Sequence, residues 1–397
     1  MRTNLLVLVL AIWPVTALAQ GAGCGRVDLF PGADWAVPAP EEAGWDIEGL
    51  AKAEALFRAE PSAALVAIHR GRPVVWWGDT DTRFTAQSLR KALLNALLGG
   101  LIAEGRLKRE TTLEALGIDD SDPPLSPAER MATVEDLMRA RSGIFHSALY
   151  ETGFHQQNRA ALAAEETAAG TDLIPPGARW VYNNWDFNAL GTIVEQAGGA
   201  PIGVQFAERV AQPIGMQDFA ARDVGYTTRD HPAEVHFGNR SDHRAYVFDM
   251  STRDLARFGL LYLACGAWDG QPVLPAAWVR DSFDGPDTRE GAPAGSDTGF
   301  GAYGYLWAID RPGARYFEGL RLRDPFAFVQ GNRGHVLAVF PTLDLVIAHQ
   351  VATIGGVGPE AQLRRLREGS PEVSDDHIAR LFAAIIAAHP DAATAFE

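Results

Sequence analysis

Residues that favour β-strands gather near both ends of the chain, and residues that favour helices fill the long stretch between them. The β-rich runs 65–68 and 74–77, joined at Gly71, predict a hairpin near the beginning. Four more strands are predicted near the end, over residues 303–309, 325–330, 335–340 and 343–351. Strands so far apart in sequence share a sheet only if the two ends of the chain meet. The pattern therefore predicts an α/β (α+β) fold with one antiparallel sheet built from both chain ends.

Amphipathic helices are predicted to flank this sheet, at 47–59 and 375–388. The expected organisation is a signal peptide at 1–19, an extended lead-in at 20–45 and a single domain at 46–397. Within that domain the sheet lobe would comprise about 46–85 and 299–397, and an inserted, mainly helical lobe would comprise about 86–298. A cleft between two such lobes is a common place for a ligand.

The beginning of the chain has the pattern of a secretory signal peptide. An apolar stretch at 5–12 is followed by Ala17-Leu18-Ala19, which predicts cleavage before Gln20. The apolar stretch is short for a membrane span, and no stop-transfer segment follows it. We therefore expect a secreted or periplasmic protein with no membrane span in the mature chain. A lipoprotein anchored through Cys24 is the less favoured alternative, because the residue three positions before it is Gly rather than Leu.

Charge and cysteine content limit the possible partners. The formal net charge of −15 argues against nucleic acid and anionic membranes. No Cys/His cluster has zinc-ligand spacing, so we expect neither a metal nor another cofactor. The two cysteines, Cys24 and Cys265, could pair in an oxidising compartment. The favoured interpretation of Cys265 is a small buried apolar residue, because it ends the apolar run 260–265.

Ser88 and Lys91 form a Ser-x-x-Lys pattern at the start of a predicted helix. Residues three apart lie on one face of a helix, so the hydroxyl and the amine can touch. Serine needs an adjacent base to act as a nucleophile, and lysine can be that base where burial lowers its pKa. The chain has only three lysines against 32 arginines, which makes a lysine at this place more informative. We predict Ser88 as a nucleophile and Lys91 as its base.

Tyr182 and Asn184 follow a Pro-Pro-Gly turn and precede a predicted helix, so both can face one cleft. The phenol could relay a proton to a leaving group, and the amide could hold the lysine or a substrate carbonyl. Asparagine is also a common helix N-cap, which is the alternative for this position. Trp185, the next residue, is a candidate substrate contact.

A glycine-bounded turn at 331–335 leads into a predicted strand. Its glycines would let the backbone approach a ligand closely at the edge of the sheet. The candidate substrate-binding residues in it are Asn332, Arg333 and Gly334. The backbone N–H groups of Ser88 and His335 would form an oxyanion hole, which stabilises charge developing on a substrate carbonyl. An ordinary hairpin turn is the alternative for this segment alone.

Taken in order, these motifs resemble the serine β-lactamase and penicillin-binding-protein superfamily. The most similar branch is the class-C-like serine hydrolases, which includes esterases and aminohexanoate-oligomer hydrolases. The resemblance spans about residues 40–390 and rests on the segments 88–97, 116–120, 133–144, 182–186, 254–259 and 343–347. It implies a β-lactamase/transpeptidase-like fold, with 46–397 as a single catalytic domain.

The resemblance also implies a reaction, in which Ser88 attacks an ester or amide carbonyl to form an acyl-enzyme and Lys91 and Tyr182 move the proton. The β-lactamases and peptidoglycan enzymes of the superfamily carry Lys or His, followed by Thr-Gly, where this chain has Asn332-Arg333-Gly334. Because that cationic residue helps to bind a substrate carboxylate, we expect a small ester or amide substrate instead. The alternatives are a weakly active or non-catalytic penicillin-binding or sensor-like module, and a true β-lactamase or D,D-peptidase. The oligomeric state is not predicted.

Overall fold

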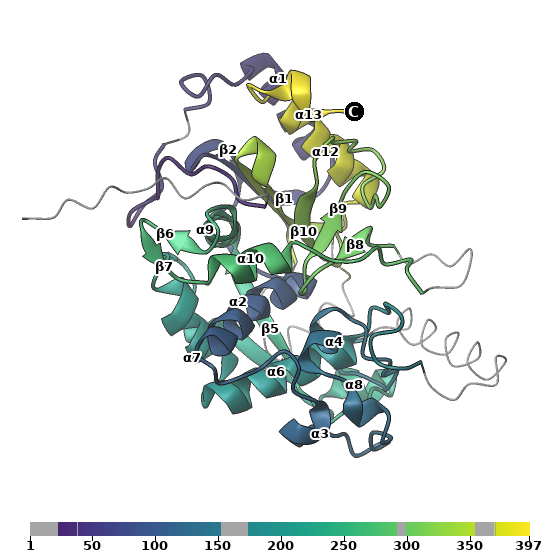
Figure 1. Cartoon of the computed structure of the whole chain (residues 1–397). Helices are drawn as coiled ribbons and strands as arrows, with labels where there is room; N and C mark the ends of the chain where they lie inside the picture. The colour runs from purple at the N-terminus through teal and green to yellow at the C-terminus, as the bar shows by residue number, and fades with distance from the viewer. Residues whose placement is uncertain (1–22, 38, 152–173, 292–298, 354–368, 370) are drawn as a thin grey trace, which may run out of the picture.

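The computed structural model of the chain describes residues 23–37, 39–151, 174–291, 299–353, 369 and 371–397 (Figure 1). The predicted signal peptide at 1–19 lies outside the described residues. A sheet with helices on both faces forms one part of the molecule, and a mainly helical part lies beside it (Figure 1). The boundaries predicted for these parts stay predictions.

One antiparallel sheet of seven strands unites the two ends of the chain, in the order β2-β1-β12-β11-β10-β9-β8. Its strands are β1 (Ser62–His69), β2 (Arg72–Gly78), β8 (Ala302–Tyr303), β9 (Ala308–Asp310), β10 (Phe326–Gly331), β11 (His335–Phe340) and β12 (Leu345–Val351). β1 pairs with β12 in a register that runs from Ser62↔Val351 to His69↔Leu345. This pairing of the beginning with the end confirms the predicted fold class.

Helices cover both faces of the sheet, which explains why β11 and β12 are mostly apolar and are buried along their whole length. On one face lie α1 (Ile47–Ala59) and α12 (Asp375–Ala387), which pack against each other. On the other face α9 (Thr252–Leu263) packs against β12, β11 and β1. Gly259 lets α9 come close, because a Cβ there would lie 2.4 Å from the Val346 Cγ1 atom.

The mainly helical part is built around α2 and α6, which pack together and are buried along most of their length. These two helices are α2 (Arg90–Ala103) and α6 (Asn184–Gly198). The remaining α-helices of the described residues are α3 (Leu113–Leu116), α4 (Val134–Met138), α7 (Ile202–Phe206), α8 (Pro232–Phe237), α10 (Ala276–Ser282) and α13 (Ala392–Ala395). Short turns of 3-10 or π type are η1 (Gln87–Leu89), η2 (Glu129–Met131), η3 (Ala207–Ala211), η4 (Ala221–Asp223) and η5 (Pro341–Leu343). None of the helices described has the length and apolarity that a membrane crossing requires.

The sequence did not predict the strands of two smaller sheets, and all of these strands except β5 are short. The middle of the chain contains a three-stranded sheet, and a small hairpin follows α9; these strands are β3 (Arg83–Thr85), β4 (Val224–Thr227), β5 (Ala245–Ser251), β6 (Ala267–Trp268) and β7 (Gln271–Pro272). The prediction of one strand over 303–309 is wrong. The chain turns back after β8, so that β9 pairs with both β8 and β10. Leu306 adopts a left-handed φ of 62°, which interrupts an extended strand.

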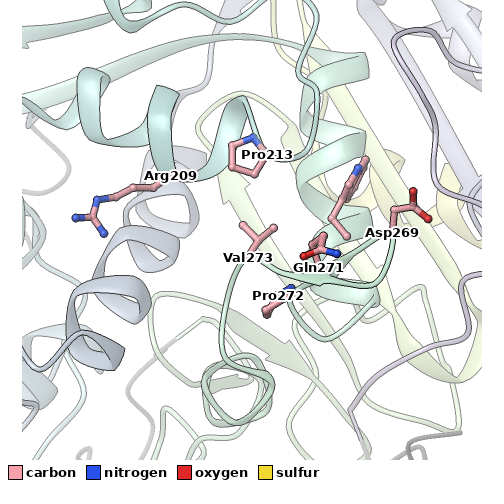
Figure 2. Close-up of a pocket in the computed structure, with 7 residues that line it drawn as sticks. Arg209, Pro213, Asp269, Gln271, Pro272 and Val273 are labelled. Carbon is pink, nitrogen blue, oxygen red and sulfur yellow. The ribbon is translucent and has the colours of Figure 1, made fainter. Parts of the chain in front are cut away.

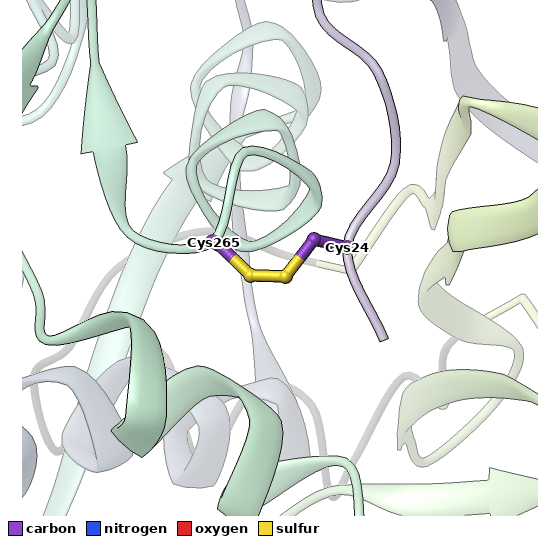
Figure 3. Close-up of a disulfide and its surroundings, with 2 residues drawn as sticks. All are labelled: Cys24 and Cys265. Carbon is purple, nitrogen blue, oxygen red and sulfur yellow. A yellow bond between two sulfur atoms is a disulfide. The ribbon is translucent and has the colours of Figure 1, made fainter. Parts of the chain in front are cut away.

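A disulfide joins the lead-in to the end of α9 (Figure 3). The Cα atoms of Cys24 and Cys265 lie 5.4 Å apart, within the usual range for such a bond. The favoured interpretation of Cys265 as an unpaired buried residue is therefore wrong, and the pairing that was the alternative is the one found. Beside the disulfide, the Gly25 N–H donates to the Leu263 carbonyl at 2.9 Å.

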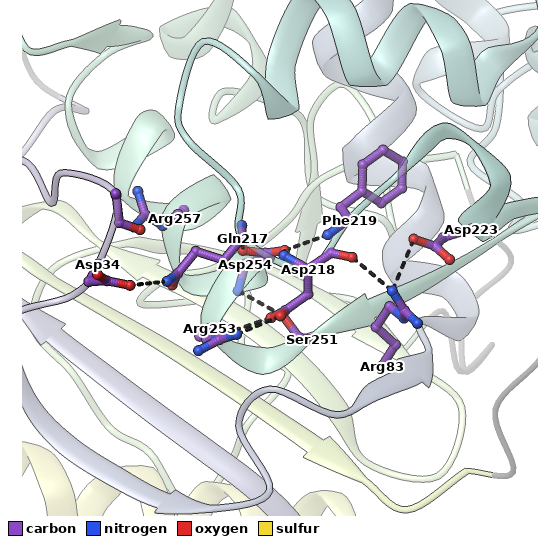
Figure 4. A network of polar contacts seen from close by, with 11 residues as sticks. Asp34, Arg83, Gln217, Asp218, Phe219, Asp223, Ser251, Arg253, Asp254 and Arg257 are labelled. Carbon is purple, nitrogen blue, oxygen red and sulfur yellow. Dashed lines mark hydrogen bonds and ion pairs between the residues drawn. The ribbon is translucent and has the colours of Figure 1, made fainter.

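A polar network holds a later part of the lead-in against the same helix (Figure 4). Arg257 of α9 is fully buried and donates to the Gly32 carbonyl at 2.9 Å. Asp254, one turn earlier, accepts the backbone N–H of Gln217 at 2.7 Å, and the Gln217 side chain donates to Asp34 at 2.9 Å. The lead-in is thus an integral part of the fold rather than a loose tail.

Candidate active site

The backbone before Ser88 is fixed from two directions. On one side, the Ala86 N–H donates to the Phe248 carbonyl of β5 at 2.8 Å, which ties the turn η1 to the three-stranded sheet. On the other side, the Tyr150 hydroxyl donates to the Gln87 side-chain oxygen at 2.8 Å. Gln87 has a left-handed φ of 51°, which a non-glycine residue adopts only under constraint. These contacts hold the sharp turn that presents Ser88 ahead of α2.

Ser88, Lys91 and Tyr182 form a closed triangle of polar atoms. Lys91 Nζ lies 2.7 Å from Ser88 Oγ, and the Tyr182 hydroxyl donates to Ser88 Oγ at 3.0 Å. The Lys91 amine also forms a hydrogen bond with the Tyr182 hydroxyl. The structure therefore brings together the three residues that the sequence singled out, although Ser88 lies in η1, Lys91 in α2 and Tyr182 in the loop before α6.

The surroundings of Lys91 favour the uncharged amine. The side chain is only 1% exposed, and the rings of Tyr182 and Phe187 each lie 4.7 Å from Nζ. Burial holds the pKa of Lys91 well below its ordinary value, and the neighbouring Arg90 cation lowers it further. The Glu151 carboxylate acts in the opposite direction, but its effect is the smallest of the three. A neutral Lys91 can accept the Ser88 proton.

The surroundings of Tyr182 favour its protonated, uncharged form. Burial raises the pKa of its hydroxyl above the ordinary value, although the hydrogen bond to Ser88 and the Arg90 cation partly offset that rise. The phenol therefore stays protonated around neutral pH. A neutral amine and a neutral phenol, both bonded to one serine oxygen, can take up a proton and pass it on without leaving a stable buried charge.

Asn184 does not contact the lysine or an open cleft among the described residues. It is buried in the first turn of α6, and its side-chain oxygen accepts from Arg90 Nη2 at 3.4 Å. Asn188, one turn later, accepts from the same nitrogen at 2.9 Å. The Arg90 guanidinium carbon lies 4.4 Å from the centre of the Tyr246 ring. The role predicted for Asn184, holding the lysine or a substrate carbonyl, is thus replaced by an anchor for the buried Arg90, while the N-cap of α6 is Asn183.

The structure does not support a substrate contact for Trp185. Its side chain is 0% exposed, and its Nε1–H donates to the Asp120 carboxylate at 2.8 Å. Asp120 also accepts from the Ser241 hydroxyl at 2.7 Å. Trp185 therefore stabilises the helical part from inside.

The turn between β10 and β11 reaches the nucleophile through Gly331. A Cβ on Gly331 would lie 2.9 Å from the Gln87 Cβ and 3.0 Å from the Ala86 carbonyl oxygen, so only glycine allows this approach. Gly334 has a different reason to be glycine. Its φ is 97°, and a Cβ there would lie 2.5 Å from the Val373 carbonyl oxygen, which places Gly334 against the segment before α12 rather than against a ligand.

The other residues of this turn have mixed positions. Asn332 is exposed, and Arg333 is half-buried with its guanidinium 3.6 Å from the Glu372 carboxylate. The His335 side chain is fully buried, and neither ring nitrogen has a hydrogen-bond partner in the part of the chain described. Burial lowers the pKa of His335 to about 3, so this ring is neutral. The oxyanion hole predicted from the N–H groups of Ser88 and His335 stays a prediction.

Sequence reasoning missed several residues around the triangle. Arg90 and Phe187 set the environment of Lys91, Tyr150 holds the turn before Ser88, and Phe300 stacks on Tyr182 with ring centres 5.3 Å apart. Arg90 gave a usable signal, since it lies inside the Ser-x-x-Lys pattern. The other three gave none, because only the tertiary fold brings them to the site.

Two further observations bear on where chemistry can occur. In the described ranges, no group of three or more His, Cys, Asp or Glu side chains is arranged to hold a metal ion. Figure 2 shows a separate surface hollow beside the β6–β7 hairpin, lined by Arg209, Pro213, Trp268, Asp269, Gln271, Pro272 and Val273. These lining residues include no nucleophile with an adjacent base, so Ser88 remains the candidate reaction centre.

Comparison with known proteins agrees with the fold and the order of the motifs. The family model named Beta-lactamase matches residues 50–367. The chain belongs to the beta-lactamase family. A comparison with curated protein sequences finds no match.

Solved structures resemble this family member over most of its length. A protein from Bacillus anthracis assigned as a 6-aminohexanoate-dimer hydrolase has a TM-score of 0.58 at 18% identity, over 91% of this chain and 88% of that one. A family VIII carboxylesterase has a TM-score of 0.56 at 15% identity, over 88% and 98%. A penicillin-binding protein homologue from Caulobacter crescentus has a TM-score of 0.53 at 16% identity, over 83% and 98%. At such identities the likeness establishes the fold alone.

Proposed function

We propose that the chain is a serine hydrolase that cleaves a small ester or amide through an acyl-enzyme on Ser88. The observation that carries the proposal is the triangle of Ser88, Lys91 and Tyr182, in which burial lowers the pKa of the amine and raises that of the phenol. A base without charge beside a serine hydroxyl is the arrangement that serine nucleophiles require.

The proposed reaction has two stages. In the first, Ser88 Oγ bonds to the substrate carbonyl carbon, Lys91 accepts the serine proton, and the bond to the alcohol or amine breaks. That proton passes through the Tyr182 hydroxyl to the departing oxygen or nitrogen. In the second stage, water attacks the acyl-enzyme and the same groups return a proton to Ser88, which releases the acid. Backbone N–H groups of η1 and of the neighbouring turn would stabilise the carbonyl oxygen during both stages.

The charges beside the site favour a substrate without a carboxylate. At the turn after β10, the chain has Asn332 followed by Arg333, and the Arg333 guanidinium is near the Glu372 carboxylate. Asp375, at the start of α12, adds a second acidic group near the same strand through its bond to the Gln330 side chain. A penicillin or a peptide C-terminus would therefore meet less attraction here than a neutral ester or amide.

Intact-mass measurement after reaction with a fluorophosphonate tests the proposal. The wild-type protein should gain one adduct, and Ser88→Ala should gain none. Hydrolysis rates should then be compared across p-nitrophenyl esters, simple amides, D-amino-acid peptides and a penicillin. The expected order places esters or amides first, with all activity lost in Ser88→Ala and in Lys91→Ala.

Other results would point to the alternatives. A penicillin that acylates Ser88 and is released only over hours, with no steady hydrolysis of any substrate, indicates a penicillin-binding or sensor-like module. A penicillin or a D-Ala-D-Ala peptide cleaved faster than every ester indicates a β-lactamase or D,D-peptidase. An adduct that persists in Ser88→Ala would refute the assignment of the nucleophile.

We also propose that the protein is exported and that Cys24 is not lipidated. The support is its disulfide with Cys265, which occupies the sulfur that a lipid anchor would use and which is typical of oxidising compartments. The protein purified from the periplasm or medium should start at Gln20 and contain no free thiol. A mature chain that starts at a lipid-modified Cys24 would contradict the second part of the proposal, and a chain that keeps residues 1–19 and stays in the cytoplasm would contradict the first.

A further inference from the structure

An aromatic stack continues outward from the catalytic phenol. The Phe300 ring lies 5.3 Å from the Tyr182 ring at an interplanar angle of 14°, and 5.3 Å from the Tyr316 ring at 10°. Trp180 packs against the same Phe300 ring at 5.6 Å. The three stacked side chains are only partly buried. Each of the three side chains therefore keeps some exposed surface.

The far end of the stack is fastened to the strand that reaches the nucleophile. The Tyr316 hydroxyl donates to the Asp375 carboxylate at 2.5 Å and is bonded to the side chain of Gln330. Gln330 precedes Gly331, whose backbone lies against the turn before Ser88. The stack thus spans from the reacting hydroxyl to the end of β10.

This end of β10 extends beyond its neighbour β9. The pairing of β10 with β9 ends at Phe328↔Ala308, so Val329–Gly331 continue past the neighbouring strand. A substrate held by Ser88 would lie between this end of β10 and Tyr182, and its departing group would leave next to the Tyr182 hydroxyl. Phe300 stacks on the ring that carries this hydroxyl.

We propose that Phe300 is a specificity-determining residue that contacts the leaving group and favours a flat aromatic alcohol or amine over an aliphatic one of equal size. Partly exposed rings bind other rings through edge-to-face or offset contacts that a saturated ring cannot reproduce. In the reaction, the bond between the carbonyl carbon and the aryl-bearing oxygen or nitrogen breaks, and the departing atom receives its proton from Tyr182. This inference rests on the proposed hydrolase function and names the substrate class of that same site.

The test compares benzyl acetate with cyclohexylmethyl acetate. Both esters give the same acetyl-enzyme and release primary alcohols of similar size, so the ratio of their kcat/KM values isolates the contact with the leaving group. The ratio in Phe300→Ala should fall by about 2- to 12-fold relative to wild type, the range expected for one aromatic contact. Phe300→Leu, which keeps an apolar side chain, should show a similar fall. Tyr316→Phe, which keeps the ring and loses only the hydroxyl, should preserve the ratio.

A purely structural role for Phe300 predicts something else. If the ring only supports Tyr182, both esters slow equally and the ratio is unchanged in Phe300→Ala and Phe300→Leu, which overturns the inference while leaving the hydrolase function intact. If wild type shows no Ser88-dependent hydrolysis of either ester and no fluorophosphonate adduct, the proposed function itself fails. Should Phe300→Ala not fold, Phe300→Leu decides the question alone.

Discussion

Lys91→Met tests whether the buried lysine is neutral in the folded protein. Methionine is close to lysine in shape, fits an apolar site, and cannot bind a proton. Two aromatic rings pack against the lysine side chain, since Nζ lies 4.7 Å from the ring centres of Tyr182 and Phe187. The bond from the Tyr182 hydroxyl to Ser88 Oγ, at 3.0 Å, does not depend on the lysine. We expect the variant to be inactive and, near neutral pH, more stable than wild type.

The magnitude follows from proton linkage. The folded pKa of Lys91 is lowered well below 10.5, so between these two values the unfolded chain binds one proton that the folded chain does not. In that window the free energy of unfolding of wild type rises by about 1.4 kcal/mol for each unit of pH. The variant lacks this contribution. Its stability advantage should therefore be largest at the lower pH and shrink as the pH rises from 7.5 to 9.5, by at most about 1.4 kcal/mol for each unit of pH.

Urea unfolding of both proteins at several pH values measures this difference. Groups other than Lys91 titrate alike in the two proteins, so their contributions cancel. Lys52→Met is the matched control, because Lys52 is exposed on α1 and its replacement should give a difference that does not change with pH. A difference between wild type and Lys91→Met that is flat over this range would refute a neutral Lys91, and with it the role of base.

Three further predictions concern separate parts of the molecule. Tyr182→Phe should lower kcat by about 10²- to 10⁴-fold, because it removes the proton relay but leaves Ser88 and Lys91 bonded; unchanged kcat contradicts the relay. Trp185→Phe should lower the free energy of unfolding by about 1–3 kcal/mol through loss of the bond to Asp120, whereas a raised KM with unchanged stability would restore its role as a substrate contact. Cys265→Ser should cost about 2–5 kcal/mol of stability in oxidising buffer, and equal melting temperatures for variant and wild type would show that the disulfide does not form.

The sheet could be predicted because its strands carry their own signals. β1, β10, β11 and β12 are mostly apolar runs bounded by turns; the last three lie within two residues of their predicted bounds, and β1 begins three residues before its predicted run. The failures have local causes. β5 (Ala245–Ser251) is fully buried and continues directly into α9, so its short apolar run could not be told from the start of a helix. The segment 303–309 looks like one strand until Leu306 turns the chain back.

The site was predictable to the extent that its chemistry depends on residue type and spacing. Ser88 and Lys91 are three apart on one turn, and Tyr182 follows in the expected order. The roles predicted for Asn184 and Trp185 were not found, because their side chains point away from Ser88 although they are close to Tyr182 in sequence. The start of α6 points Asn184 at Arg90 and Trp185 at Asp120, and no sequence pattern reports which side of a helix faces the cleft when both sides are buried.

Arg90 is fully buried, and its charge affects the pKa values of Lys91 and Tyr182. A fully buried arginine without a carboxylate partner is destabilising in itself. In the part of the chain described, its hydrogen bonds go to Asn184 and Asn188, and its guanidinium lies over the Tyr246 ring; all three partners are neutral. That charge lowers the pKa of Lys91 and acts against the burial-induced rise in that of Tyr182. In the proposed reaction, the buried cation would therefore favour a neutral Lys91 without any contact to the substrate.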